Sequence, residues 1–129
     1  MIIFVGDKPS KQNLDPDIPF VGTQSYKKLL SWIAKLDVDY NDSVICNVEH
    51  LKIDSMGHMS VELNCMFFEI DPEGDRFVAL GNNAAKALRA LSLPFFQLPH
   101  PSGLNRKLND KTYVEYVLDE CKEYIHEAN

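Results

Sequence analysis

Short apolar runs alternate along the chain with longer segments in which apolar residues recur at helical spacing. A short apolar run bounded by turn-forming residues predicts a buried strand, and recurrence at every third or fourth position predicts an amphipathic helix. The predicted strands are 1–5, 44–48, 76–80 and 94–98. The predicted helices are 24–36, 84–91 and 110–126, and the apolar residues of 60–70 fit a further helix that Pro72 and Gly74 would end.

Two of the predicted helices carry a continuous apolar face, which is expected to pack against the strands. In the helix 24–36 this face consists of Tyr26, Leu29, Leu30, Ile33 and Leu36. In the helix 110–126 it consists of Val114, Val117, Leu118, Cys121 and Ile125.

The order of these elements indicates an α/β fold. Strands that are separated by helices pair in parallel, and the crossover helices cover the faces of the sheet. A chain of 129 residues with 45% hydrophobic content buries one core and has no room for two domains. We therefore predict a single three-layer α/β/α domain over residues 1–129 with a small four-stranded, mainly parallel sheet.

The formal net charge of −6 argues against a domain that holds nucleic acid by an overall positive charge. The acidic residues gather at 37–42, at 71–75 and in the last helix. A locally basic rim on an acidic body would bind DNA weakly and with a strong dependence on salt. The basic residues of such a rim are Lys8, Lys11, Arg106, Lys107 and Lys111.

The three cysteines, Cys46, Cys65 and Cys121, lie far apart and form no CxxC pair, which indicates reduced and mostly buried thiols. The four histidines show no ligand spacing for zinc, so no metal is expected. No segment has the pattern of a signal peptide or of a membrane span. We therefore expect a cytoplasmic protein without membrane contact, in the host cytoplasm if the source is a virus.

Two turns follow predicted strands and carry most of the candidate chemistry. Residues 6–10 follow the first strand, and residues 99–106 follow the fourth strand. Because loops at the carboxyl ends of parallel strands meet at one edge of the sheet, a histidine and an acid in these turns are expected to face a common site.

Four segments stand out in chain order. They are Gly6-Asp7-Lys8-Pro9-Ser10 with Asp15, Pro19-Phe20-Val21-Gly22 with Leu29-Leu30, Val78-Ala79-Leu80-Gly81-Asn82-Asn83-Ala84-Ala85, and His100-Pro101-Ser102-Gly103-Leu104-Asn105-Arg106. Together they resemble the uracil-DNA glycosylase superfamily, and the matches are collinear and span residues 1–107. The first two segments are similar to the iron–sulfur type of bacteria and archaea, and the last has a Gly-Leu pair like that of the mismatch-specific branch.

The resemblance implies two catalytic residues. His100 would donate a hydrogen bond to the base oxygen as negative charge grows there, and Asp7 would stabilise the sugar cation or orient the attacking water. The alternatives are a loop histidine that caps backbone groups and a turn aspartate that accepts backbone N–H bonds. Lys8 stands where other branches place a water-directing Asp or Asn, so it would contact a phosphate or mark altered chemistry.

The resemblance also implies a base pocket formed by Phe20, Asn47 and Gly6. Phe20 would stack on a flipped base, and the Asn47 amide would read its Watson–Crick edge. The alternatives are a core aromatic and a loop asparagine without a partner. Leu104 would fill the gap in the DNA stack, with flanking residues on the phosphates. The complete DNA-binding set is Lys8, Pro9, Ser10, Ser102, Gly103, Leu104, Asn105, Arg106 and Lys107.

The chain departs from the iron–sulfur type in several ways. That type needs four cysteines, and the three here are placed differently, so neither a cluster nor another cofactor is expected. The middle segment, 49–76, is short for the superfamily, and Val48-Glu49-His50-Leu51 lacks the basic and proline residues expected after the second strand. These departures suggest a minimal member of the kind that a phage genome encodes.

The leading hypothesis is therefore a monomeric DNA repair hydrolase that excises uracil, or a related altered pyrimidine, from single- or double-stranded DNA by base flipping. Lys8 favours one alternative, a catalytically weakened or inactive module that still binds DNA. The other alternative is an accessory or decoy protein-interaction domain whose acidic surface is the working face.

Overall fold

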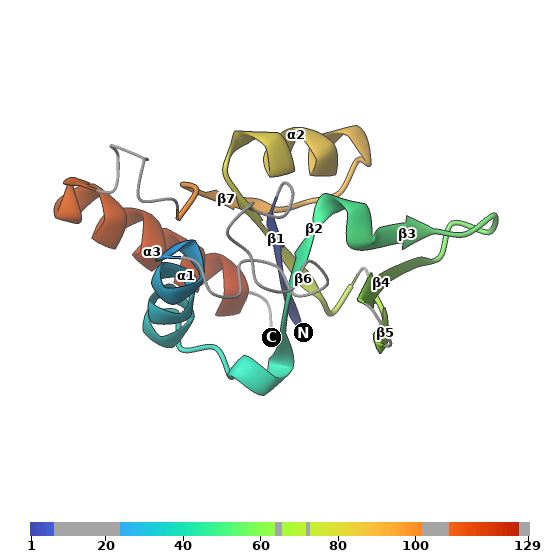
Figure 1. The fold of residues 1–129 in the computed structure, drawn as a ribbon, viewed down its shortest axis with the longest axis horizontal. Helices are drawn as coiled ribbons and strands as arrows, with labels where there is room; N and C mark the ends of the chain where they lie inside the picture. Colours follow the sequence, from blue (N-terminus) through green and yellow to red (C-terminus); the bar gives the residue numbers. More distant parts are fainter. Residues whose placement is uncertain (7–23, 64–65, 72, 102–108, 127–129) are drawn as a thin grey trace.

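A computed structural model describes residues 1–6, 24–63, 66–71, 73–101 and 109–126 of the protein. Figure 1 shows the arrangement of its helices and strands. The strands are β1 (Ile2–Gly6), β2 (Ser43–Asn47), β3 (Leu51–Ile53), β4 (Met59–Leu63), β5 (Met66–Glu69), β6 (Arg76–Leu80) and β7 (Phe96–Leu98). The helices are α1 (Gln24–Lys35), α2 (Asn82–Ala90) and α3 (Lys111–His126), with 3-10 turns η1 (Tyr40–Asp42) and η2 (Val48–His50).

Four strands form a parallel sheet, as the sequence predicts, and their order is β2-β1-β6-β7. The predicted strand 76–80 has the observed bounds, and the first two strands are displaced by one residue. The last strand starts two residues later than predicted, at Phe96. Pro94 has no backbone N–H to offer a sheet ladder, which fits this later start.

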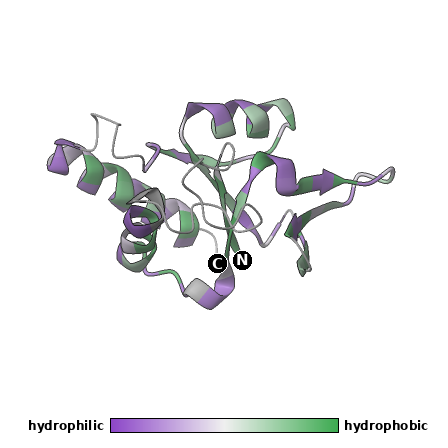
Figure 2. Cartoon of the chain, in the orientation of Figure 1, coloured by the Kyte–Doolittle hydropathy of each residue, from purple (hydrophilic) through white to green (hydrophobic). Residues whose placement is uncertain are grey.

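The two faces of the sheet are covered by different elements, which gives the expected three layers. Alternate residues of β1 point to opposite faces, so Phe4 packs with α1 and α3 while Val5 packs with α2. Leu29 and Leu36 of α1 and Leu118 of α3 are buried on the first face. Figure 2 shows that hydrophobic and hydrophilic residues alternate along the helices.

The apolar faces of the two long helices agree with the prediction where the structure describes them. All five residues of the α3 face are buried or partly buried in the core beside α1. On α1, Trp32 is also buried, although it lies outside the predicted face. None of the helices in the described part of the chain is both long and apolar enough to cross a membrane.

The prediction of a helix over 60–70 is wrong. This region forms β4 and β5, which join β3 in a three-stranded antiparallel sheet. Because the run is short, its apolar residues fit the helical period of 3.6 and the strand period of 2 about equally well. Cross-strand pairs such as Leu51 with Val61 and Val61 with Phe68 favour the strands. The side chain of Val61 packs against the face of the parallel sheet that α2 covers.

Candidate functional site

The carboxyl ends of the parallel strands meet at one edge of the sheet. The register places Gly6 beside Asn47, and Leu80 beside Leu98. From β1 the chain continues to β2, which pairs on one side of β1. From β6 it continues to β7, which lies in the opposite direction across the sheet. The direction in which successive strands are added therefore reverses between β1 and β6. In open α/β sheets this switch point is where ligands bind.

Asn47 ends β2 at this edge and is completely buried, with 0% of its surface exposed. It is the one buried polar residue among those the structure describes. Its side-chain oxygen Oδ1 and nitrogen Nδ2 have no hydrogen-bond partner within the described residues. A buried amide without partners is unfavourable, so the site holds an unused donor and an unused acceptor side by side.

The backbone of Asn47 is held by a contact that the sequence analysis missed. Its N–H donates to His50 Nδ1 over 2.9 Å, which requires that Nδ1 carry no proton. The spacing Asn47 to His50 is that of a helix N-cap and the third residue of the following turn, and this signal was present in the sequence. The same turn forms a capping box in which the Asn47 side chain also faces the His50 backbone N–H, without a side-chain hydrogen bond. His50 therefore helps to position both the backbone and the amide of Asn47.

His100 lies two residues beyond β7 at the same edge and packs against Gly81. A Cβ atom at Gly81 would lie 3.1 Å from His100 Cβ and 3.4 Å from Cδ2, so any side chain there would press on the histidine and displace it slightly. Gly81 also has a φ of +94°, in the region that favours glycine, and its N–H donates to Leu98 O over 2.9 Å. The turn after β6 thus holds the segment that carries His100.

The structure places three of the residues proposed from the sequence at the same edge of the parallel sheet. Gly6 and Asn47 are neighbours in adjacent strands, and His100 follows the last strand of the same sheet. The other candidates follow Gly6 or Pro101 along the chain and lie outside the described residues. They are Asp7, Lys8, Pro9, Ser10, Phe20, Ser102, Gly103, Leu104, Asn105, Arg106 and Lys107.

Among the described residues, the groups with shifted pKa values add no reactive group at this edge. Burial raises the pKa of Cys46, one residue before Asn47, to about 12, so the thiol stays protonated and unreactive. Asp54 has a lowered pKa because the His58 backbone N–H donates to it. That aspartate lies in the exposed turn between β3 and β4, away from the parallel sheet.

Comparison with known proteins agrees with this arrangement. A search of curated proteins finds no significant match. A family model for the uracil DNA glycosylase superfamily matches residues 1–122, a range that includes the four strand ends of the parallel sheet, Asn47 and His100. The chain therefore belongs to the uracil DNA glycosylase superfamily.

Proposed function

We propose that this protein hydrolyses the N-glycosidic bond of uracil, or of a related altered pyrimidine, in DNA. The superfamily consists of DNA glycosylase-type hydrolases. What we propose for this member is the identity of the excised base and that the protein is catalytically active. The observation that carries it is the buried amide of Asn47, whose Oδ1 and Nδ2 lack partners within the described residues.

The Asn47 amide is complementary to the edge of uracil. A primary amide donates through its nitrogen and accepts through its oxygen, while uracil offers an acceptor at O4 and a donor at N3. Two hydrogen bonds formed in a buried site would remove the cost of the unused groups, about 1–3 kcal/mol for each. A base inside the duplex stack cannot reach such a site, so the nucleotide must be flipped out.

His100 is suited to stabilise the departing base. Cleavage leaves negative charge on the pyrimidine, and a hydrogen-bond donor fixed beforehand at the base oxygen stabilises that charge without reorganisation. The packing of His100 on Gly81 supplies such fixation. The bond between the base and the sugar breaks, the electron pair stays with the base, and water adds to the sugar cation.

Sequence resemblance supports roles for the residues around this pair. Asp7 follows Gly6 directly and is proposed to stabilise the sugar cation or to direct the water. Phe20 is proposed to stack on the base and Leu104 to occupy the vacated position in the DNA. The remaining residues of the two turns are proposed to hold phosphates.

The test is excision from an oligonucleotide that contains one uracil. Alkali should cleave the treated strand at that position, and a matching strand with thymine should stay intact. His100→Ala should lower the rate about 10²–10³-fold, the usual loss when one donor to a developing anion is removed. His58→Ala is the matched control, because His58 is exposed in the turn between β3 and β4 and should leave the rate unchanged.

The second candidate is a DNA-binding module without turnover. Lys8 favours it, since a charged lysine cannot direct water as an Asp or Asn can. Binding to a uracil-containing strand with no cleavage at enzyme excess would select this candidate. No DNA binding even at low salt, where electrostatic attraction is strongest, would reject both and favour a protein-interaction domain.

A further inference from the structure

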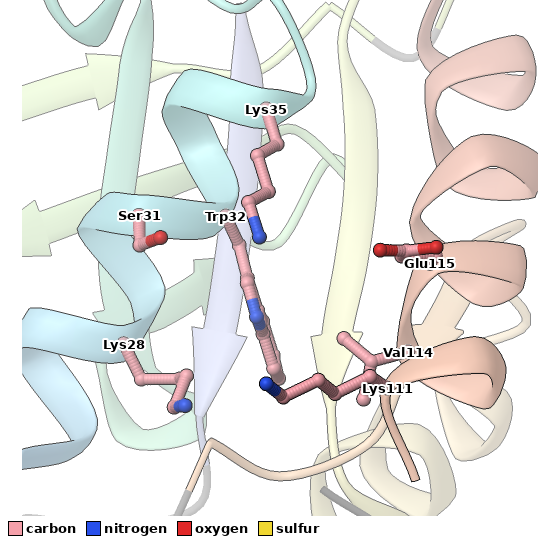
Figure 3. A pocket seen from close by; sticks show the side chains of 7 residues that line it. All are labelled: Lys28, Ser31, Trp32, Lys35, Lys111, Val114 and Glu115. Atoms are coloured by element: carbon pink, nitrogen blue, oxygen red, sulfur yellow. The ribbon is translucent and has the colours of Figure 1, made fainter.

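A cleft of about 290 Å³ lies between α1 and α3, on the face of the sheet that these helices cover. Figure 3 shows the side chains that line it. The floor is apolar, since Trp32 is buried and Val114 is partly buried. The polar lining residues are Lys28, Ser31 and Lys35 from α1, and Lys111 and Glu115 from α3.

The charges around this cleft are unbalanced. Among the described residues that line it, three ammonium groups face one carboxylate, although the whole chain has a formal net charge of −6. Within the described part of the chain, none of Lys28, Lys35 and Lys111 forms an ion pair with a carboxylate. Like charges brought together without counter-charges repel one another, and an anion bound among them would remove that repulsion.

The position of the cleft connects it to the edge that holds Asn47 and His100. In Figure 3 the arrowhead of β1 lies at the same end of the cleft as Lys28 and Lys111, while Lys35 lies toward the other end. Lys111 begins α3, and Lys28 is in the first half of α1. The amino-terminal ends of both helices, which carry partial positive charge, therefore point toward the candidate site.

We propose that this cleft, defined by Lys28, Lys35 and Lys111, binds phosphate groups of the DNA strand on one side of the flipped nucleotide. This inference rests on the proposed function for the identity of the strand. Lys28 and Lys35 are seven residues apart, about 10 Å along α1. The lysines are therefore spread along the cleft, as contacts to successive phosphates of a strand would require. Such contacts fix the register of the strand without reading its sequence.

The first experiment measures the salt dependence of binding to a single-stranded oligonucleotide without uracil. The slope of log Kd against log salt concentration falls by about 0.7 for each phosphate contact that is lost on a single strand. We expect Lys28→Gln, Lys35→Gln and Lys111→Gln each to lower the slope by this amount. The triple variant should lower it by about 2.

Matched variants separate a local contact from overall charge. Lys27→Gln removes the same charge from the same helix, and Lys122→Gln from α3, but neither residue lines the cleft. Both should change the slope much less than the three cleft variants. Glu115→Gln should have the opposite effect and tighten binding, because it removes a carboxylate that lines the cleft.

A second experiment distinguishes a DNA phosphate from a free one. Oligonucleotides with one neutral methylphosphonate at each position in turn should show weaker binding at one or two positions for the natural protein, and no such loss for the triple variant. Inorganic phosphate should shift the backbone NMR signals of Ser31 and Glu115 only while the lysines are present. A shift with phosphate but no position-dependent loss on DNA would overturn the assignment to a DNA strand.

The inference and the proposed function fail separately. Equal slopes for the cleft variants and for Lys27→Gln would overturn the inference even if uracil is excised. Lower slopes in the cleft variants without any excision would overturn the proposed function and leave the phosphate cleft supported. Circular dichroism of each variant confirms that the fold is retained, which exposed lysines on helices should allow.

Discussion

Asn47 is a polar side chain in a place where an apolar one would be more stable. Its amide is fully buried with no partner among the described residues, and each unpaired group of this kind costs about 1–3 kcal/mol. We expect Asn47→Leu, which is similar in size, to raise the free energy of unfolding by about 1 kcal/mol while excision is lost. Urea denaturation and the excision assay measure the two effects.

The control for this change is Asn41→Leu. Asn41 is exposed within η1, so the same substitution should change the free energy of unfolding by less than about 0.5 kcal/mol. A loss of stability in Asn47→Leu would show that the amide serves the fold, contrary to its proposed role at the base.

Gly81 gives a second prediction at the scale of one residue. Gly81→Ala adds a Cβ in a backbone region that strains it and 3.1 Å from His100 Cβ. Gly57→Ala has a similar strain, with a φ of +85°, but its Cβ would meet nothing within 4 Å. Both should lose about 1 kcal/mol of stability from the backbone.

The difference between the two variants reports the contact with His100. We expect Gly81→Ala to lose additional stability and to slow excision, whereas Gly57→Ala should excise at the natural rate. Thermal unfolding and initial excision rates test this comparison. Equal activity of the two variants would show that the position of His100 does not depend on Gly81.

At the scale of elements, the three-stranded sheet is anchored to the parallel sheet mainly by the buried side chain of Val61. Val61 of β4 is 0% exposed and packs against the parallel sheet, while Phe67 of β5 is 59% exposed. We expect Val61→Ala to cost about 2 kcal/mol, and Phe67→Ala to cost less than about 0.5 kcal/mol although it removes a larger side chain. Chemical denaturation of both variants measures the difference.

The same sheet shows where local patterns were insufficient. The residues of 60–70 are compatible with a helix when they are considered alone, and only pairing with β3 and packing on Phe77 and its neighbours favour strands. The helices α1 and α3 were predicted to within about one residue because their periodicity extends over several turns. An outcome opposite to that expected for Val61 and Phe67 would contradict the assigned faces of β4 and β5.

At the scale of the whole molecule, each face of the sheet buries one free thiol. Cys46 lies in the core on the α2 side, and Cys121 lies in the core beside α1 and α3. This confirms the prediction of reduced, buried thiols for these two residues, while Cys65 lies outside the described part of the chain. Burial raises the pKa of each thiol from 9.0 to about 12.

These shifts predict a loss of stability at alkaline pH. Below pH 9 the thiols are protonated in both states, so their contribution is fully present. Between pH 9 and 12 the unfolded thiols ionise and the folded ones do not, so the free energy of unfolding falls as pH rises. The limiting slope is about 1.4 kcal/mol per pH unit for each thiol.

Urea denaturation across this pH range measures the effect. In the double variant Cys46→Ala/Cys121→Ala the free energy of unfolding should fall less steeply with pH than in the natural chain, because the two thiols are gone. Ionisation of tyrosines and lysines contributes equally to the decline in both proteins. Parallel declines would mean that the thiols ionise as easily in the folded protein as in the unfolded one.

The sequence by itself determined the four strands of the parallel sheet, the long helices and the identity of the candidate residues, because these depend on spacing along a few neighbouring turns or strand positions. It also indicated the superfamily, through motifs that follow one another in the chain. Only the tertiary structure showed that Asn47 is buried without partners, that His100 packs on Gly81, and that Lys28 and Lys111 share a cleft. These properties depend on contacts between residues far apart in the chain, which local periodicity does not encode.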